Sequence, residues 1–142
     1  MAKKHILLNN RDSLYRVDIS KIVYFEASGA YTTFVLCNRQ KGVVCMSLAK
    51  MKELMVNTLG SDASMFARVG RRFIVNLEYV YHIDILKHNL VVTDGASFAY
   101  QLPISREALK ELRDLYLNTA KTANPTNTPN PAIATRPTDN KK

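Results

Sequence analysis

Short apolar runs separated by turn residues dominate the start of this chain, and their spacing limits the folds open to it. Asn, Asp, Ser and Gly residues, which are typical of turns, separate neighbouring runs by five residues or fewer. A parallel connection needs a crossover of a dozen or more residues, so the sequence predicts antiparallel strands with short connections. The predicted strands are His5–Asn9, Leu14–Asp18, Lys21–Ala27, Tyr31–Cys37 and Val43–Met46.

Two segments change to a helical period. Ser47 can cap the first, in which Leu48, Met51 and either Leu54 or Met55 form an apolar stripe, with Lys50, Lys52 and Glu53 facing outwards. The second follows Ser105, with apolar residues on one side and charged residues on the other. We therefore expect one short internal helix and one C-terminal helix.

Strands resume after Gly60, beginning with Met65–Val69. From Phe73 to Ile85 every odd position is apolar or aromatic, which predicts one continuous strand with Asn76, Glu78, His82 and Asp84 on its polar face. Leu90–Thr93 and Phe98–Leu102 follow, joined by a turn at Asp94-Gly95. The predicted fold class is mainly β, an elongated antiparallel β-sandwich of short strands with the two helices.

Length and composition predict one folded domain and a tail. At 142 residues the chain is long enough for one core but short for two domains, so we expect a domain over residues 1–118. Residues 119–142 contain four of the five prolines and many Thr and Asn residues. Such a segment has too little apolar surface to offset the entropy of ordering it, which predicts a disordered basic tail.

The net charge of +8 indicates a polyanionic partner, and its placement favours one local site. Arg68, Arg71 and Arg72 lie within five residues of one another. Arg71 and Arg72 directly follow Gly70, where the chain can turn freely, so their guanidinium groups can project from a loop. This arrangement predicts an anion-binding site, whereas solvated charges paired with Glu78 or Asp62 are the alternative.

The sequence offers no pattern for catalysis, metal binding or export. Cys37 and Cys45 are seven residues apart rather than in a two-residue-spaced pair, and of His82, Asp84 and His88, the first two simply occupy the polar face of a strand. There is no secretory signal and no apolar stretch long enough to span a bilayer. We expect a cytoplasmic protein that is not an enzyme and has no cofactor.

Four segments together resemble the LytTR DNA-binding domain of bacterial response regulators, over about Tyr15 to Leu117. They are Ile22–Ala27 with Ala30–Thr33, Ser47–Leu54, Phe66–Asn76, and Pro103–Arg106. In this family a histidine commonly precedes the motif arginine, and here Gly70 stands in its place. Members usually follow a phosphoacceptor receiver domain, and only residues 1–4 precede the first apolar segment, so we expect a freestanding module.

The resemblance implies how the chain binds DNA. Arg71, Arg106 and Thr32 fall on DNA-facing positions, with Thr32 and Arg106 in successive major grooves and Arg71 over the minor groove between them. It implies transcription regulation at paired direct repeats in promoters, with two protein copies on each site. The alternative is an interaction module that kept the fold and modulates another regulator without reading DNA.

Further candidates surround these three residues. We expect Thr33 and Arg72 to accompany Thr32 and Arg71, and Arg68, Lys50 and Lys52 to hold phosphates, although solvated surface explains the last three equally well. Arg106 would occupy the first position of a helix capped by Ser105, where the macrodipole disfavours a cation by about 0.3–1 kcal/mol. A DNA partner explains that placement, and a hydrated arginine is its alternative. Asn76 belongs to the family motif, and we expect it to stabilise the fold rather than to contact DNA.

Overall fold

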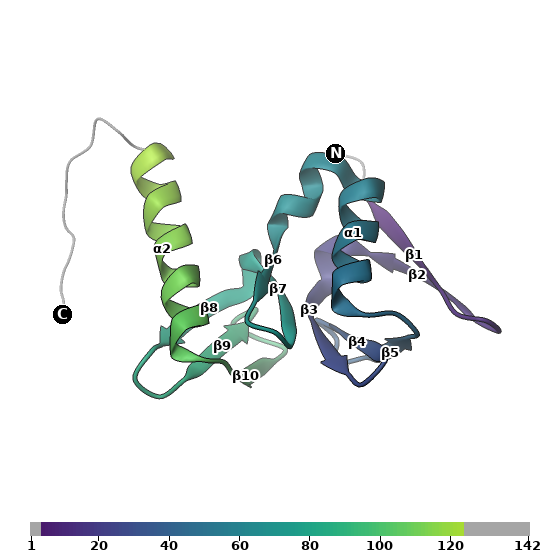
Figure 1. Ribbon diagram of the computed structural model, residues 1–142, viewed down its shortest axis with the longest axis horizontal. Coiled ribbons are helices and arrows are strands. Elements are labelled where there is room, and N and C mark those ends of the chain that lie inside the picture. Colours follow the sequence, from purple (N-terminus) through teal and green to yellow (C-terminus); the bar gives the residue numbers. More distant parts are fainter. Residues whose placement is uncertain (1–3, 124–142) are drawn as a thin grey trace. The chain divides into compact units, whose positions relative to one another are not determined.

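The computed structural model describes the backbone of residues 4–123 and the side chains up to Asn118 (Figure 1). The strands are β1 His5–Asn9, β2 Leu14–Asp18, β3 Ile22–Ser28, β4 Tyr31–Leu36, β5 Lys41–Val44, β6 Phe66–Val69, β7 Phe73–Asn76, β8 Val80–Asp84, β9 Asn89–Thr93 and β10 Ala99–Pro103. The α-helices are α1 Leu48–Leu59 and α2 Arg106–Ala123, and short 3-10 turns occupy Ile19–Lys21 (η1), Gly60–Met65 (η2) and Leu77–Tyr79 (η3).

The strands form three sheets with antiparallel pairing throughout. β1 and β2 make a hairpin, β5-β4-β3-β7-β6 make a five-stranded sheet, and β10-β9-β8 make a three-stranded sheet. The predicted mainly β, antiparallel class with two helices is therefore confirmed. Most strand boundaries fall within two residues of those predicted, since the turn residues between the runs do end them.

The main core lies where the hairpin, the five-stranded sheet and α1 bury their apolar faces. Ser47 caps α1 by accepting a hydrogen bond from the Lys50 backbone N–H at 3.2 Å, as predicted. The helix then buries Leu48, Met51, Met55 and Leu59. The side chains of Phe25 and Phe66, from β3 and β6, meet edge to face in this cluster with ring centres 5.9 Å apart.

The prediction of one continuous strand from Phe73 to Ile85 is wrong. β7 ends at Asn76, a 3-10 turn follows, and β8 belongs to another sheet. Asn76 is fully buried rather than on a polar face, and Tyr81 is 75% exposed rather than in the core. The break occurs because the Asn76 amide donates to the Ile22 carbonyl at 2.8 Å while its side-chain oxygen accepts from the Glu78 N–H at 2.9 Å.

Within the described residues, the chain divides into two units, one up to Leu109 and one from Lys110 onwards. All strands, α1 and the first turn of α2 belong to the first unit. Helix α2 is described as far as Ala123, so it extends beyond residue 118, where the disordered tail was predicted to follow. The rest of that predicted tail, residues 124–142, lies outside the described residues. Within the described part of the chain, neither helix is long and apolar enough to cross a membrane.

Candidate nucleic-acid interface

The loop that carries Arg71 is a tight connection between β6 and β7. Gly70 has φ +69°, a left-handed conformation that residues with a side chain rarely adopt. The Arg68 guanidinium donates to the Arg71 carbonyl at 2.9 Å and so closes the loop from the β6 side. Its side chain therefore holds the loop, a role that the sequence did not indicate, since it offered phosphate contact and solvated surface as the two alternatives for Arg68.

Arg72 is anchored on the other side of this loop. Its guanidinium forms an ion pair with Glu26 on β3 and lies 5.4 Å from the centre of the Phe73 ring. The Arg72 carbonyl accepts from the Ala27 N–H at 2.8 Å. The alternative partners considered for the arginines, Glu78 and Asp62, are not used, and Asp62 pairs with Lys4 at 2.9 Å.

Glu26 is a residue of this region that sequence reasoning did not find. It is half-buried and lies opposite Phe73 in the pairing of β3 with β7. Glu26 is 46 positions from Arg72 in the chain, so only the pairing of two distant strands brings them together. The one available signal is a carboxylate within the otherwise apolar run Ile22–Ala27.

The start of α2 is built as the sequence predicted. The Ser105 hydroxyl oxygen accepts from the Ala108 N–H at 3.2 Å, and Arg106 is the first helical residue. Arg106 is exposed at the positive end of the helix, where its charge is disfavoured by about 0.3–1 kcal/mol. The first-turn amide groups that Ser105 leaves unsatisfied are suited to an anion beside the guanidinium.

The Arg71 loop and the start of α2 are neighbours in the first unit. A Cβ added to Gly70 would lie 3.6 Å from the Ala108 Cβ and 3.9 Å from the Ile104 Cγ2. A hollow of about 330 Å³ separates the two segments and is lined by residues 69–73 and 103–105. Arg71 and Arg106 are both exposed, and neither side chain makes an ion pair or hydrogen bond with another described residue.

Thr32 does not join this group, contrary to what the resemblance implied. Its side chain is 0% exposed, and its hydroxyl donates to the Met46 carbonyl at 2.7 Å. In this conformation it has neither a free hydroxyl nor an exposed methyl for a thymine. Thr33, the next residue of β4, is half-buried and lies opposite Glu26 and Val43 in the sheet.

The two candidate lysines on α1 differ in their surroundings. The Lys50 side chain is 74% exposed, and its ammonium lies 3.9 Å from the Glu53 carboxylate. Lys52 does not face outwards as predicted, because its ammonium donates to the Phe66 carbonyl at 2.7 Å. Partial burial lowers the pKa of Lys52. Lys52 thus ties α1 to β6, and Lys50 keeps a surface position.

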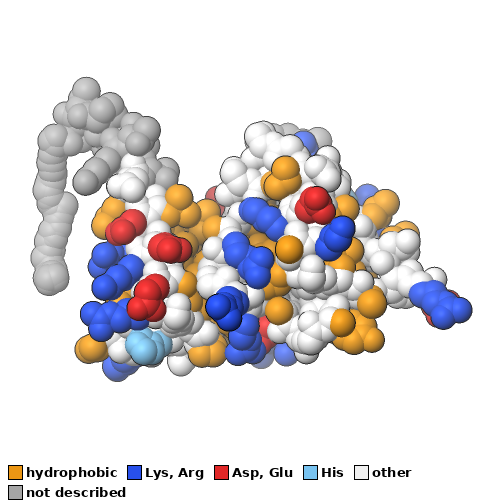
Figure 2. Space-filling view, in the orientation of Figure 1, with side chains coloured by type: hydrophobic (Ala, Val, Ile, Leu, Met, Phe, Trp, Pro, Cys, Tyr) orange, Lys and Arg blue, Asp and Glu red, His pale blue; other side chains and the backbone are white. Residues whose placement is uncertain are grey.

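Basic side chains gather around β6 and β7 in the space-filling view (Figure 2). Arg68, Arg71 and Arg72 belong to these strands and their connection. Among the described residues, no three His, Cys, Asp or Glu side chains are grouped so as to hold a metal ion. The guanidinium groups of this surface and the first-turn amides of α2 suit phosphates and guanine edges.

The sequence matches the model of the LytTR DNA-binding domain family over residues 12–116. The chain belongs to this family of DNA-binding domains. The match includes β2 to β10, the internal helix and the first part of α2, so it spans every segment on which the resemblance was based.

Two curated relatives are transcriptional regulators of Paraburkholderia xenovorans, the heme-containing CO-sensing regulators RcoM 2 and RcoM 1. Each is 33% identical to this chain over 101 residues, which is 70% of this chain and 34% of the relative. The chain thus spans about a third of the length of these relatives. A solved LytTR DNA-binding domain of a putative methyl-accepting/DNA response regulator from Bacillus cereus is similar in fold, with a TM-score of 0.59 and 25% identity. That similarity covers 81% of this chain and 98% of the solved one.

Proposed function

We propose that this protein binds double-stranded DNA sequence-specifically through the Arg71 loop and the start of α2, and that it regulates transcription. Both segments read the duplex from one edge of the first unit. Arg71 and Arg106 make the contacts that depend on base sequence, and Arg68 and Arg72 hold the loop that presents Arg71. Lys50 contributes a phosphate contact that adds less to the affinity for DNA. Thr33 is the remaining candidate on β4.

One observation carries this proposal. Two exposed arginines without protein partners among the described residues lie on adjacent segments, one on a tight loop and one at a helix start. Neither position stabilises the fold by an ion pair, and the position of Arg106 opposes the helix dipole. An anionic partner accounts for both. The family of DNA-binding domains and the transcriptional regulators among the relatives support duplex DNA as that partner.

The proposal extends to pairs of sites. Two copies of the chain bind two direct repeats in a promoter, each through the same edge. A duplex with two repeats then binds two copies, and a duplex with one repeat binds a single copy. Analytical ultracentrifugation of the full chain with both duplexes measures this stoichiometry, and a single copy on the paired site contradicts it.

The test of sequence-specific binding begins with selection of bound duplexes from a random pool by the full chain. Fluorescence anisotropy then measures the affinity for the best duplex and for a scrambled one. Arg71→Ala and Arg106→Ala should each weaken the best site by about 5- to 150-fold, which corresponds to the 1–3 kcal/mol of a base-edge contact. Arg11→Ala is the matched control, because Arg11 is an exposed arginine at the tip of the β1–β2 hairpin.

Two other outcomes contradict parts of the proposal. Equal losses on the best and scrambled duplexes would identify the two arginines as phosphate contacts that do not read sequence. The selection could enrich no sequence, and any remaining binding to duplex DNA could fail to weaken with salt. Together these results would identify the chain as a protein-interaction module with this fold. Pull-down of another regulator by the wild type and equally by Arg71→Ala would support that second function.

A further inference from the structure

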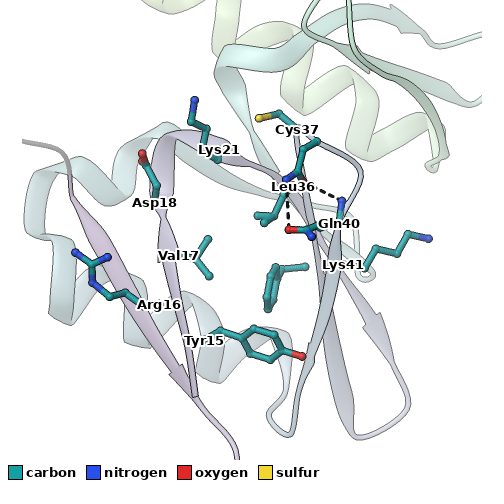
Figure 3. A pocket seen from close by; sticks show the side chains of 11 residues that line it. Tyr15, Arg16, Val17, Asp18, Lys21, Leu36, Cys37, Gln40 and Lys41 are labelled. Carbon is teal, nitrogen blue, oxygen red and sulfur yellow. Dashed lines mark hydrogen bonds between the residues drawn. The ribbon is translucent and has the colours of Figure 1, made fainter. Parts of the chain in front are cut away.

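A second hollow lies between the β1–β2 hairpin and the β4–β5 part of the large sheet, and it shares no lining residue with the hollow beside the Arg71 loop. It is a cavity of about 600 Å³, within the range of sites that hold small molecules. Figure 3 shows the side chains of Tyr15, Val17 and Leu36 pointing into this space. None of the residues that line it is a candidate DNA contact.

Near its tip, the hairpin is tied to the large sheet. Asn10 holds the hairpin to the edge strand β5, since its amide donates to the Val43 carbonyl at 2.7 Å and its oxygen accepts from the Cys45 N–H at 2.9 Å. Next to this clasp, the rings of Tyr15 and Phe34 meet edge to face at 4.9 Å. The hairpin and the sheet therefore enclose an apolar space whose inner end is aromatic.

Most of the charged residues that line this cavity are basic. Arg16, Lys21 and Lys41 line it, and all three are exposed. The one lining carboxylate, that of Asp18, already accepts hydrogen bonds from the N–H and the hydroxyl of Ser20 at 3.0 and 2.7 Å. Figure 3 shows the charged ends of Arg16, Lys21 and Lys41 around the margin, directed away from the apolar interior.

We propose that this cavity binds a small amphipathic anion, whose apolar body lies on Tyr15, Val17 and Leu36 and whose acidic group lies among the surrounding cations. The apolar interior rules against a bare phosphate or a DNA backbone, because neither has an apolar body to place against the interior. The excess of cations at the margin favours an acid over a neutral ligand of the same shape. Long exposed Lys and Arg side chains can turn towards such a group at little cost.

The probe for this site is 8-anilinonaphthalene-1-sulfonate, an aromatic body with one sulfonate. Its fluorescence with the full chain should rise to saturation at one dye per chain, with a dissociation constant on the order of 10–100 µM for a ligand of this size. N-phenyl-1-naphthylamine has the same body without the sulfonate. It should bind about threefold to tenfold more weakly, because it forfeits the contacts with the cations.

Charge variants connect this difference to the margin of the cavity. The double variant Lys21→Glu/Lys41→Glu should weaken sulfonate binding by about tenfold and binding of the neutral dye by less than about twofold. Lys87→Glu/Lys110→Glu is the matched control, since it reverses two exposed lysines that do not line the cavity and so changes the net charge equally. A loss of the same size in the control would mean that net charge governs binding, and would overturn the proposal.

The two cysteines locate the bound dye. Cys37 is half-buried and lines the cavity, whereas Cys45 is exposed and does not line it. With Cys45→Ser, the sulfonate dye should slow the reaction of Cys37 with a disulfide reagent by at least about threefold at saturation. With Cys37→Ser, the reaction of Cys45 should keep its rate.

Three results would contradict the proposal. Binding that does not saturate, equal binding of the two dyes, or unchanged reactivity of Cys37 would each show that the cavity does not hold the anion. If the dye separates a dimer into monomers, the cavity is covered by a second copy of the chain instead. These outcomes are independent of DNA binding, because none of the variants used replaces a candidate DNA contact.

Discussion

Arg68 on β6 donates a hydrogen bond from its guanidinium to the backbone carbonyl of Arg71, three residues along the chain, at 2.9 Å. The bond joins the last part of one strand to the loop that follows it. It fixes the backbone from which the Arg71 side chain projects into solvent. Under the proposed function, Arg68 is a positioning residue that acts on DNA through Arg71.

Replacement of Arg68 should weaken DNA binding without changing the number of phosphate contacts. We expect Arg68→Ala to reduce affinity for the best duplex by about 3- to 10-fold, since a hydrogen bond of this kind contributes about 0.5–1.5 kcal/mol. The slope of log K against log salt should stay that of the wild type. A slope smaller by about 1 would instead show that Arg68 itself touches a phosphate.

The sequence predicts the elements of this fold well because they depend on local features. Ser47 and Ser105 cap their helices, and Asp94-Gly95 forms its turn, all through contacts within four residues. The break at Asn76 escaped prediction because Leu77 and Tyr79 continue the alternation through a 3-10 turn. Only the contact of Asn76 with Ile22, 54 residues earlier, reveals it.

The candidate site was predictable where it depends on chain position and not where it depends on packing. Arg71 follows a glycine turn and Arg106 follows a cap, so their exposure could be read from neighbouring residues. The burial of Thr32 depends on the Met46 carbonyl, 14 residues away, and the ion pair of Arg72 depends on strand pairing. Motif position alone gives no information about either contact.

Thr32→Val should reduce stability and leave the base preference unchanged. Valine has a similar shape, but it leaves the partly buried Met46 carbonyl without the hydrogen bond that Thr32 donates. The free energy of unfolding should fall by about 1–3 kcal/mol, measured by urea denaturation. A changed consensus in the duplex selection with this variant would restore Thr32 as a base contact.

Asn76→Ala should destabilise the protein more than an exposed asparagine does. The substitution removes the bonds to the Ile22 carbonyl and the Glu78 N–H and leaves a small cavity in a fully buried place. We expect a loss of about 2–4 kcal/mol in the free energy of unfolding. Asn57→Ala, at an exposed position of α1, is the control and should change it by less than about 1 kcal/mol. Equal losses of stability in the two variants would mean that Asn76 does not hold the 3-10 turn after β7.

Asp94 should give the fold an acid-sensitive contribution. The Ala96 N–H, together with those of Ser97 and Phe98, holds the pKa of its carboxyl at about 2. Because the pKa is lower in the folded state, this contribution is present above about pH 4 and is lost as the pH falls towards 2. Asp94→Asn should therefore show a smaller loss of stability between pH 4 and 2 in urea denaturation. A loss identical to that of the wild type would contradict the role of this carboxylate.

Gly42 on β5 lies where a side chain cannot fit without moving aromatic rings. A Cβ there would lie 2.2 Å from the Phe34 Cζ and 2.9 Å from the Tyr15 Cζ. Gly42→Ala should therefore lower the free energy of unfolding by about 1–3 kcal/mol, the usual cost of overpacking. Because the two rings close the inner end of the cavity, their displacement should also weaken binding of the sulfonate dye. Gly29→Ala is the contrasting variant, since a Cβ there meets no atom within 4 Å and only its φ of +62° opposes the change. It should cost about 1–2 kcal/mol and leave dye binding unaltered.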